Sequence, residues 1–379
     1  MTAMNPNDAS ATPGPSLTSG GTMLVVGATG IVGNGALEHF GAQPGWEVIA
    51  LSRRVPAAHA GLRHLPVDLT DARACRAALA GVAGITHVLF AALHEKADLL
   101  AGWQQADQID TNVTMLRHLL DALEASPSAA TLRHVTLLQG TKAYGSHVGR
   151  VPVPAKERWP RLPHTIFYWQ QEDLLRERQA RGGWAFTILR PQIILGYASG
   201  SPMNILAAIG AYAAIQRSRG LPLWYPGGGR YVNAASDSRL IARATQWAGT
   251  HPVAFGETYN VVNGDVLVWH DVWAAIAAHF GMPVGEPRPM RLADEMPRQE
   301  AAWGELVRRH GLQPTTLESL VGSSWQFADR NLAAGQPDPD DRVVSPVKLR
   351  QAGFTGCEDT EASLLHWLGR MQQARLLPA

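Results

Sequence analysis

Three glycines at regular spacing follow a short apolar run near the start of the chain. The run begins at Met23, the glycines are Gly27, Gly30 and Gly33, and residues 34–40 continue at helical spacing. A strand, a tight glycine turn and a helix in this order let the pyrophosphate of a dinucleotide approach bare backbone. The phosphates then bind the N–H groups that open the helix, where the helix dipole is positive. The motif predicts dinucleotide binding, although such glycines can also serve close packing alone.

The next apolar segment, 46–51, is expected to be the strand that ends beside the adenosine ribose. It is followed by Ser52, Arg53 and Arg54, at a place where a carboxylate would accept the ribose 2′-hydroxyl of NAD. Two guanidinium groups and a hydroxyl instead suit the 2′-phosphate of NADPH, because arginine makes charge-assisted, often bidentate, bonds to phosphate. We therefore expect NADPH as the cofactor. The alternative is a solvated arginine pair.

A tyrosine and a lysine supply a second chemistry. Tyr168 lies on a helix expected before the sixth strand, and Lys142 comes just after the fifth strand. A hydroxyl held near a cation can donate to an oxygen that becomes negative during a reaction, which is the task of an oxyanion donor. The alternatives are that Tyr168 is one aromatic residue of a buried Phe-Tyr-Trp cluster and that Lys142 is a surface lysine.

The elements that must position these residues alternate along the chain. Strands are expected at 62–67, 86–92, 132–138 and 184–189, and a helix is expected at 106–125, where apolar residues recur at three- and four-residue steps. This alternation predicts an α/β fold with a Rossmann-type, doubly wound parallel sheet whose ligands lie at the carboxyl ends of the strands. Cofactor contacts are predicted at Gly27, Thr29, Gly30, Ile31, Gly33, Ser52, Arg53, Arg54, Asp68, Leu69, Ala91, Ala92, Gln139, Lys142, Tyr168, Pro191 and Ile193. Asp68 could bind the adenine amino group or cap the following helix.

Beyond residue 190 the pattern becomes helical, with segments separated by Pro- and Gly-rich loops. Helices are expected at 203–217, 238–248, 269–280 and 361–373, and a strand at 258–262. We expect residues 23–190 to form the NADPH-binding domain and residues 191–379 to form mainly a smaller, helix-rich substrate lobe, with some segments returning to the sheet. Most tryptophans of this half should be core residues, and a few should line an apolar pocket over the nicotinamide. The tryptophans considered, in the core and in the lining together, are Trp224, Trp247, Trp269, Trp273, Trp303 and Trp325.

The composition narrows the function classes. The chain of 379 residues carries 33 basic and 32 acidic residues, so its net charge attracts neither nucleic acid nor a membrane surface. It has no run of about 18 apolar residues, and residues 1–22 are expected to be a disordered tail rather than a signal peptide. With only Cys75 and Cys357 and no Cys/His cluster, the sequence predicts a cytoplasmic protein without disulfides or metal.

Ten stretches spread over residues 23–329 resemble one family. They are Gly27-Ala-Thr-Gly-Ile-Val-Gly-Asn34, Ser52-Arg-Arg54, Leu138-Gln-Gly-Thr-Lys142, Phe167-Tyr-Trp-Gln-Gln-Glu-Asp173, Arg190-Pro191 followed by Gly196, Pro202-Met-Asn204, Ala211-Tyr-Ala-Ala-Ile215, Leu221-Pro222, Asn260-Val-Val-Asn-Gly-Asp265 and Trp325-Gln-Phe-Ala-Asp329. Together they resemble the progesterone 5β-reductase and iridoid synthase family, atypical extended short-chain dehydrogenases that reduce activated carbon–carbon double bonds.

The resemblance implies the roles of Tyr168 and Lys142. In ordinary short-chain dehydrogenases a lysine follows the catalytic tyrosine by four residues, whereas this chain has Glu172 there; the resemblance assigns the cation to Lys142. It implies NADPH-dependent 1,4-reduction of an enone, with Tyr168 and Lys142 stabilising the enolate. The residues after the lysine are Ala143-Tyr144, where plant members have His-Tyr.

Other functions stay open from the sequence. The alternatives are carbonyl reduction, sugar-nucleotide epimerase or dehydratase activity, and an NADP(H)-binding redox sensor without turnover. Glu172 and the apolar, Trp-rich lobe argue against a sugar nucleotide. We expect a small apolar carbonyl substrate and a monomer or homodimer.

Overall fold

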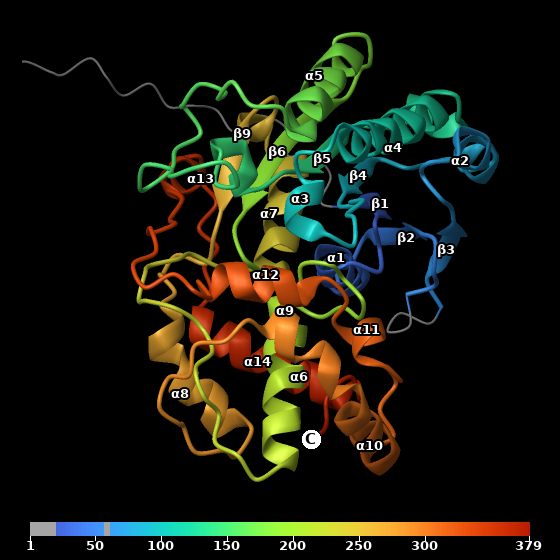
Figure 1. Cartoon of the computed structure of the whole chain (residues 1–379). Helices are drawn as coiled ribbons and strands as arrows, with labels where there is room; N and C mark the ends of the chain where they lie inside the picture. The colour runs from blue at the N-terminus through green and yellow to red at the C-terminus, as the bar shows by residue number, and fades with distance from the viewer. Residues whose placement is uncertain (1–19, 57–60) are drawn as a thin grey trace, which may run out of the picture.

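A seven-stranded parallel sheet forms the centre of the computed structural model, which describes residues 20–56 and 61–379 (Figure 1). In spatial order the strands are β3 (Arg63–Pro66), β2 (Trp46–Ser52), β1 (Gly21–Val26), β4 (His87–Phe90), β5 (His134–Leu138), β6 (Ala185–Pro191) and β9 (Thr258–Val261). Every neighbouring pair is parallel. The predicted doubly wound Rossmann-type sheet is confirmed. Strand β1 starts at Gly21, two residues inside the predicted tail, whose residues 1–19 lie outside the described part.

Helices cover both faces of the sheet, which explains why its strands read as continuous apolar runs. In β1, Leu24 and Val26 face one side, while Met23 and Val25 face the other. The first side is covered by α2 (Ala72–Leu79), α4 (Ala106–Glu124) and α5 (Phe167–Gln179), which lie together above the sheet in Figure 1. The second side is covered by α1 (Ile31–Gly41), α7 (Ser238–Thr250) and α13 (Val347–Gln351).

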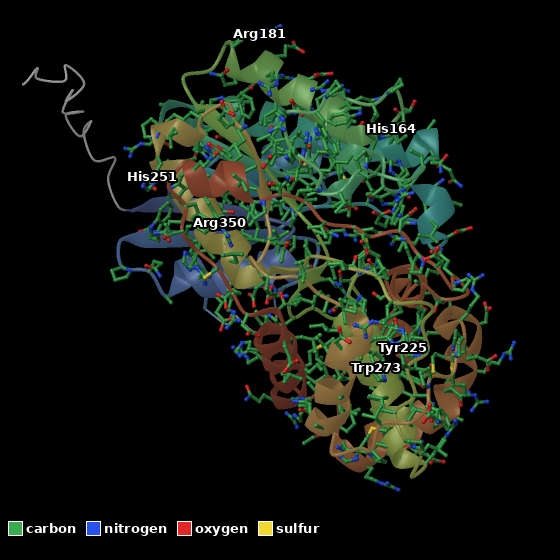
Figure 2. All side chains as sticks on the ribbon, turned by 90° about the vertical axis from the view of Figure 1, so that its left-hand side faces the viewer. His164, Arg181, Tyr225, His251, Trp273 and Arg350 are labelled. Atoms are coloured by element: carbon green, nitrogen blue, oxygen red, sulfur yellow. The ribbon has the colours of Figure 1, made fainter. Side chains whose placement is uncertain are left out.

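A helical lobe lies below the sheet in Figure 1. It comprises α6 (Ile205–Ser218), α8 (Trp269–His279), α9 (Leu292–Glu295), α10 (Glu300–His310), α11 (Leu317–Leu320) and α14 (Thr360–Gln373). Its core contains Trp303 and the pair Tyr225 and Trp273, whose ring centroids lie 5.2 Å apart (Figure 2). This confirms the predicted helix-rich part in the second half of the chain.

Two short helices join the sheet to the lobe. Helix α12 (Ser324–Asn331) lies between the two parts in Figure 1, next to α3 (Leu99–Gly102). The side chain of Gln326 accepts a hydrogen bond from the Leu99 N–H group at 2.8 Å. Strands β7 (Ile194–Leu195) and β8 (Ser236–Asp237) form a separate two-stranded ladder that follows β6 toward the lobe. These connections bring residues after 320 to the carboxyl end of the sheet.

One helix of the second half, α7, packs on the sheet rather than in the helical lobe. Helix α7 packs against α1 and the sheet, and Trp247 on it contacts that core rather than the lobe. Periodicity predicted the helix but could not tell which of two apolar cores it covers. In the described part of the chain, no helix combines the length and apolarity needed to cross a bilayer. Cys75 is buried, Cys357 is exposed, and both are free thiols.

Candidate active site

A cavity of about 530 Å³ runs along the carboxyl ends of the strands from β3 to β6 in the spatial order of the sheet, as the sequence predicted. All of the predicted cofactor-binding residues except Gly33 line it. The helical lobe and its approach add Met203, Phe327, Arg330 and Arg342 to the lining, and the segment after β4 adds Trp103. The cavity is therefore shared between the sheet and the second half of the chain.

The glycine turn packs tightly and leaves a helix N-terminus open to the cavity. Gly27 has φ +85°, and a Cβ atom there would lie 2.7 Å from the Ala92 nitrogen. Helix α1 begins after Gly30, which has no side chain to cap it, so the first N–H groups are available to a phosphate. Gly33 differs from the prediction: a Cβ atom there would lie 2.3 Å from the Gly27 oxygen, so Gly33 permits close packing of the helix on the turn.

Arg53 and Arg54 are exposed side chains on the cavity wall at the end of β2. Within the described ranges, no carboxylate lies within 4.0 Å of either guanidinium group, so both remain available to an anion. Ser52 also lines the cavity, and its buried hydroxyl donates to the Arg54 carbonyl oxygen at 2.7 Å. It shapes the turn that carries the arginines.

Asp68 lines the cavity and does not cap the following helix. Helix α2 is capped by Asp71, whose carboxylate accepts bonds from its first turn. The Asp68 carboxylate accepts from the N–H and hydroxyl groups of Thr70 at 2.9 and 2.8 Å. The backbone bond and then the hydroxyl bond from Thr70 lower the pKa of Asp68. Of the two expected roles of Asp68, helix capping is excluded, and the contact with the adenine stays a prediction.

Tyr168 lies in the first turn of α5 and lines the cavity beside Gly140. A Cβ atom on Gly140 would lie 3.2 Å from the Tyr168 hydroxyl, so a larger residue there would crowd this hydroxyl. No described residue hydrogen-bonds to this hydroxyl. Burial, and then the charge of Glu95, raises the pKa of Tyr168, while Arg190 lowers it. The phenol therefore stays protonated at neutral pH and is a hydrogen-bond donor rather than a base.

Lys142 reaches the same place from the 3₁₀ turn Thr141–Tyr144 after β5. Its ammonium nitrogen lies 5.8 Å from the centroid of the Tyr168 ring, 4.2 Å from that of Trp103 and 3.4 Å from Oε1 of Glu95. Burial lowers the pKa of Lys142, the Glu95 carboxylate raises it, and Arg330 lowers it again. Lys142 is a buried lysine beside Tyr168 and not the surface lysine of the alternative interpretation.

Glu95 is a functional candidate that the sequence reasoning missed. Its side chain has no exposed surface, and it accepts hydrogen bonds from Trp103 Nε1 at 3.2 Å and from Gln108 Nε2 at 2.6 Å. These bonds hold the carboxylate against Lys142. The available signal was its position soon after β4, on the edge of the sheet where chemistry was expected.

Glu172 occupies the position at which ordinary short-chain dehydrogenases have a lysine, and it forms ion pairs with arginines. Its Oε1 atom lies 2.9 Å from Arg176 and 3.1 Å from Arg161, and its Oε2 atom lies 3.8 Å from Arg190. Burial alone would raise the pKa of Glu172, but the bonds from Arg176 and Arg161 lower it overall. Arg176 lies four residues further along the same helix, and the Glu172 carboxylate is buried.

The aromatic lining differs from the expectation. Among the described residues that line the cavity, the large apolar side chains include Trp103, Met203 and Phe327, and none of the six tryptophans named for the second half is present. Five of those six are accounted for by packing, four in the lobe core and Trp247 against the sheet core. Spacing could not distinguish packing from lining because both need the same apolar face.

Ile193 occupies a strained position on the cavity wall. Its φ angle is +24°, a value that a β-branched residue rarely adopts. Its carbonyl oxygen accepts from the Ser236 N–H group at 3.1 Å, and the Ser236 hydroxyl accepts from the Gln192 N–H group at 2.9 Å. Strain of this kind, of order 1–3 kcal/mol, persists where surrounding contacts enforce it and is frequent at functional sites.

Comparisons with known proteins agree with this architecture. A family model described as a PRISE-like Rossmann-fold domain matches residues 68–328. The chain is 32% identical over 377 residues to the (S)-8-oxocitronellyl enol synthase CYC2 of Camptotheca acuminata, covering 94% of this chain and 93% of the relative. It is 31% identical over 383 residues to the 3-oxo-Delta(4,5)-steroid 5-beta-reductase of Arabidopsis thaliana, covering 96% and 95%.

Solved structures share the fold at lower identity. The structure of RMD from Pseudomonas aeruginosa complexed with NADPH has a TM-score of 0.64 at 16% identity, covering 94% of this chain and 99% of that chain. The UDP-glucose 4-epimerase of Thermus thermophilus complexed with NAD has a TM-score of 0.62 at 19% identity, covering 93% and 99%. These likenesses support the extended short-chain dehydrogenase fold. The family model and the relatives that match over nearly their whole length show that the chain belongs to the PRISE-like Rossmann-fold family of iridoid synthases and progesterone 5β-reductases.

Proposed function

We propose that this protein is an NADPH-dependent reductase that adds hydrogen across the double bond of α,β-unsaturated carbonyl compounds. The observation that carries the proposal is the Tyr168 hydroxyl, which lines the cavity beside Lys142 and has no hydrogen-bond partner in the described part of the chain. One relative is named as a reductase of a 3-oxo-Delta(4,5)-steroid, which is such a carbonyl compound. The reduction of such a compound needs a hydrogen-bond donor and a positive charge near the carbonyl oxygen, and Tyr168 and Lys142 would supply them.

The residues around the glycine turn fit a nicotinamide dinucleotide. The open N-terminus of α1 would bind the pyrophosphate, and the unpaired Arg53 and Arg54 would bind a 2′-phosphate, which favours NADPH over NADH. The strained Ile193 lines the cavity two residues after Pro191, whose carbonyl oxygen lies near Gly140 as the Tyr168 hydroxyl does, and the nicotinamide would be held here. When bound, NADPH supplies the hydride that the β-carbon of the substrate accepts.

Tyr168 stabilises the charge that this transfer creates. As the β-carbon gains the hydride, negative charge develops on the carbonyl oxygen, and the Tyr168 hydroxyl donates a hydrogen bond to it. Because burial keeps the phenol protonated, the donor is in place before the charge forms. A preorganised donor of this type is worth about 2.7–4 kcal/mol of transition-state stabilisation. The enolate then takes a proton from the solvent at its α-carbon, which completes the saturated product.

Lys142 adds a positive charge near the same oxygen. Its ammonium group is buried, and Glu95 favours the charged form that burial would otherwise disfavour. In a site of low dielectric constant this charge acts on Tyr168 and on the developing enolate more strongly than it would in water. The neighbouring Trp103 and Phe327 exclude water and contact the hydrocarbon part of the substrate.

NADPH oxidation with a cyclic enone and product analysis test the proposal. We expect 2-cyclohexen-1-one and linear enals to be reduced to the saturated carbonyl compounds, which mass spectrometry separates from allylic alcohols. Allylic alcohol as the main product would indicate carbonyl reduction instead. Turnover of sugar nucleotides but not enones would indicate an epimerase or dehydratase. Binding of NADPH without turnover of any of these compounds would favour a redox sensor.

A further inference from the structure

Two arginine side chains without an acidic partner lie on the cavity wall on the side of β5 and β6. Arg330 is the residue before the last of α12, and Arg342 follows in the loop beyond it; both are half-buried. In residues 20–56 and 61–379, no carboxylate oxygen lies within 4.0 Å of either guanidinium group. Arg330 donates to the Ser146 carbonyl oxygen, and Arg342 donates to the Arg330 carbonyl oxygen at 3.3 Å. These bonds hold the two groups in position but leave their charges uncompensated.

Aromatic faces hold these cations in place of acids. The guanidinium carbon of Arg330 lies 5.5 Å from the Trp103 ring centroid, and Lys142 lies 4.2 Å from the same ring. Arg342 lies 5.3 Å from the Tyr231 ring centroid. Burial, and then the charge of Arg342, lowers the pKa of Arg330 to about 10, with Tyr231 acting in the opposite direction. Among the described residues, only Lys142 of these three neighbouring cations has a carboxylate partner, that of Glu95.

The acidic residues nearby do not neutralise the pair. Asp68, at the other side of the main cavity, is the only carboxylate among its described lining residues. An adjacent cavity of about 570 Å³ shares Arg330 and Arg342, and its acidic residues belong to the segment 338–341. In that segment Asp340 pairs with the exposed Arg150 at 3.1 Å. Asp341 accepts from the Val232 N–H group at 2.7 Å.

His147 adds an unsatisfied group in the adjacent cavity that Arg330 and Arg342 share. Both ring nitrogens are buried and have no partner among the described residues. Burial, followed by the charges of His164, Lys142 and Arg330, lowers its pKa to about 4, so the ring is neutral at pH 7 and keeps an N–H group to donate. The site thus collects donors and positive charge with few acceptors.

We propose that the substrate is an α,β-unsaturated carbonyl compound that also carries a carboxylate, which Arg330 and Arg342 bind while its carbonyl oxygen faces Tyr168. Leaving partly buried cations without a counter-ion is unfavourable, and a ligand carboxylate would supply one through charge-assisted bonds. The apolar Trp103, Met203 and Phe327 would contact the carbon skeleton between the two polar ends. This inference rests on the proposed function and specifies its substrate class.

A matched pair of substrates tests the inference. The acid is 5-oxocyclohex-3-ene-1-carboxylate, and the control is its methyl ester, which has the same enone but no charge. We expect the unmodified enzyme to have a kcat/KM about 10- to 100-fold higher for the acid, the range for one hydrogen-bonded charge. Arg330→Gln and Arg342→Gln should each remove most of this preference, measured as the ratio of kcat/KM for the acid to kcat/KM for the ester in the same variant. Exposed Arg309→Gln on α10 should preserve the preference.

The outcomes separate this inference from the proposed function. If the unmodified enzyme reduces the ester as well as the acid, the carboxylate site is wrong and the proposed function stands. Retention of the acid preference in both arginine variants would also overturn it. If neither compound nor unsubstituted cyclohexenone is reduced, the proposed function itself fails. The ester rate and the NADPH dissociation constant of each variant show that the fold and the cofactor site are intact.

Discussion

The ammonium nitrogen of Lys142 lies 3.4 Å from Oε1 of Glu95, a carboxylate whose side chain has no exposed surface. Lys142 comes from the turn after β5 and Glu95 from the segment after β4, so two neighbouring strands deliver the pair to one edge of the sheet. Trp103 and Gln108 donate to the same carboxylate and fix it. The cation beside Tyr168 is therefore part of a buried ion pair rather than a free lysine on the tyrosine helix.

Replacing Glu95 with Gln should narrow the pH range of activity. Burial lowers the pKa of Lys142, Glu95 raises it, and Arg330 lowers it further, so loss of the carboxylate must lower it more. Activity that needs charged Lys142 falls as pH rises through this pKa, so the alkaline limb of the kcat profile should move to lower pH. Profiles of the unmodified enzyme and Glu95→Gln test this. Asp107→Asn, which removes the exposed partner of Lys96, is the control.

Lys142→Met should lower turnover while NADPH binding is kept. Methionine fills similar space beside Trp103 but removes the positive charge that stabilises the enolate. The measurement is steady-state kcat with a cyclic enone, together with the NADPH dissociation constant. Lys156→Met provides a control, because Lys156 forms no ion pair with any residue that the structure describes. Equal turnover in Lys142→Met and the unmodified enzyme would mean that another group balances the charge at Tyr168.

Tyr168→Phe should remove most enone reduction, because only the hydroxyl aimed at the cavity is lost. The Tyr168 backbone oxygen, which accepts from Gln139 at 3.1 Å, is unaffected, so the helix position should be kept. Loss of one oxyanion donor typically lowers kcat by about 10²- to 10³-fold. Single-turnover reduction of the enone, with NADPH binding as a control, measures this effect. A normal rate in the phenylalanine variant would refute the catalytic role of Tyr168.

Arg53→Ala/Arg54→Ala should raise the KM for NADPH and leave the KM for NADH almost unchanged. Both side chains are exposed on the cavity wall and have no acidic partner in the described ranges, so their charge is free for a 2′-phosphate. Kinetics with the two cofactors at a fixed enone concentration measure the change in preference. Equal use of NADPH and NADH by the unmodified protein would contradict this assignment.

The sequence predicted those parts of the site that depend on local chain order. A glycine turn after an apolar strand, and residues at the carboxyl ends of parallel strands, are positioned by the fold itself; hence Arg53 and Lys142 line the cavity as expected. Gly33 was placed among the ligand contacts because spacing does not reveal that its Cβ atom would meet the Gly27 oxygen. Glycine spacing alone thus cannot separate a ligand contact from a packing contact.

The remaining residues depend on packing between segments far apart in the chain. Glu95 contacts Lys142 across 47 positions, and Arg330 reaches the Ser146 carbonyl oxygen across 184 positions. No local period records such contacts, and a single Glu or Arg at such a position in the sequence is typical of a solvated charge. The prediction that some tryptophans of the second half line the cavity was wrong for a related reason. An aromatic residue in an amphipathic helix gives the same sequence pattern whether it faces a core or a cavity.

Glu172→Lys should destabilise the protein and should not rescue Lys142→Ala, although it restores the lysine spacing of ordinary short-chain dehydrogenases. Glu172 is buried and accepts from Arg176 and Arg161 at 2.9 and 3.1 Å. A lysine there would place a buried cation among arginines and remove the carboxylate that pairs with them. The double variant should therefore melt at lower temperature and stay as slow as Lys142→Ala.

Glu177→Lys is the matched control for this change. Glu177 lies on the same helix and also pairs with an arginine four residues later, Arg181 at 2.7 Å, but both side chains are exposed. Exposed pairs contribute only about 0–1 kcal/mol, so this substitution should barely move the melting temperature. The test compares Glu172→Lys and Glu177→Lys, each alone and each combined with Lys142→Ala. Thermal unfolding measures the stability of each variant, and cyclohexenone turnover measures its activity. Recovery of turnover in Lys142→Ala/Glu172→Lys would show that position 172 can supply the cation and that the site is not built around its carboxylate.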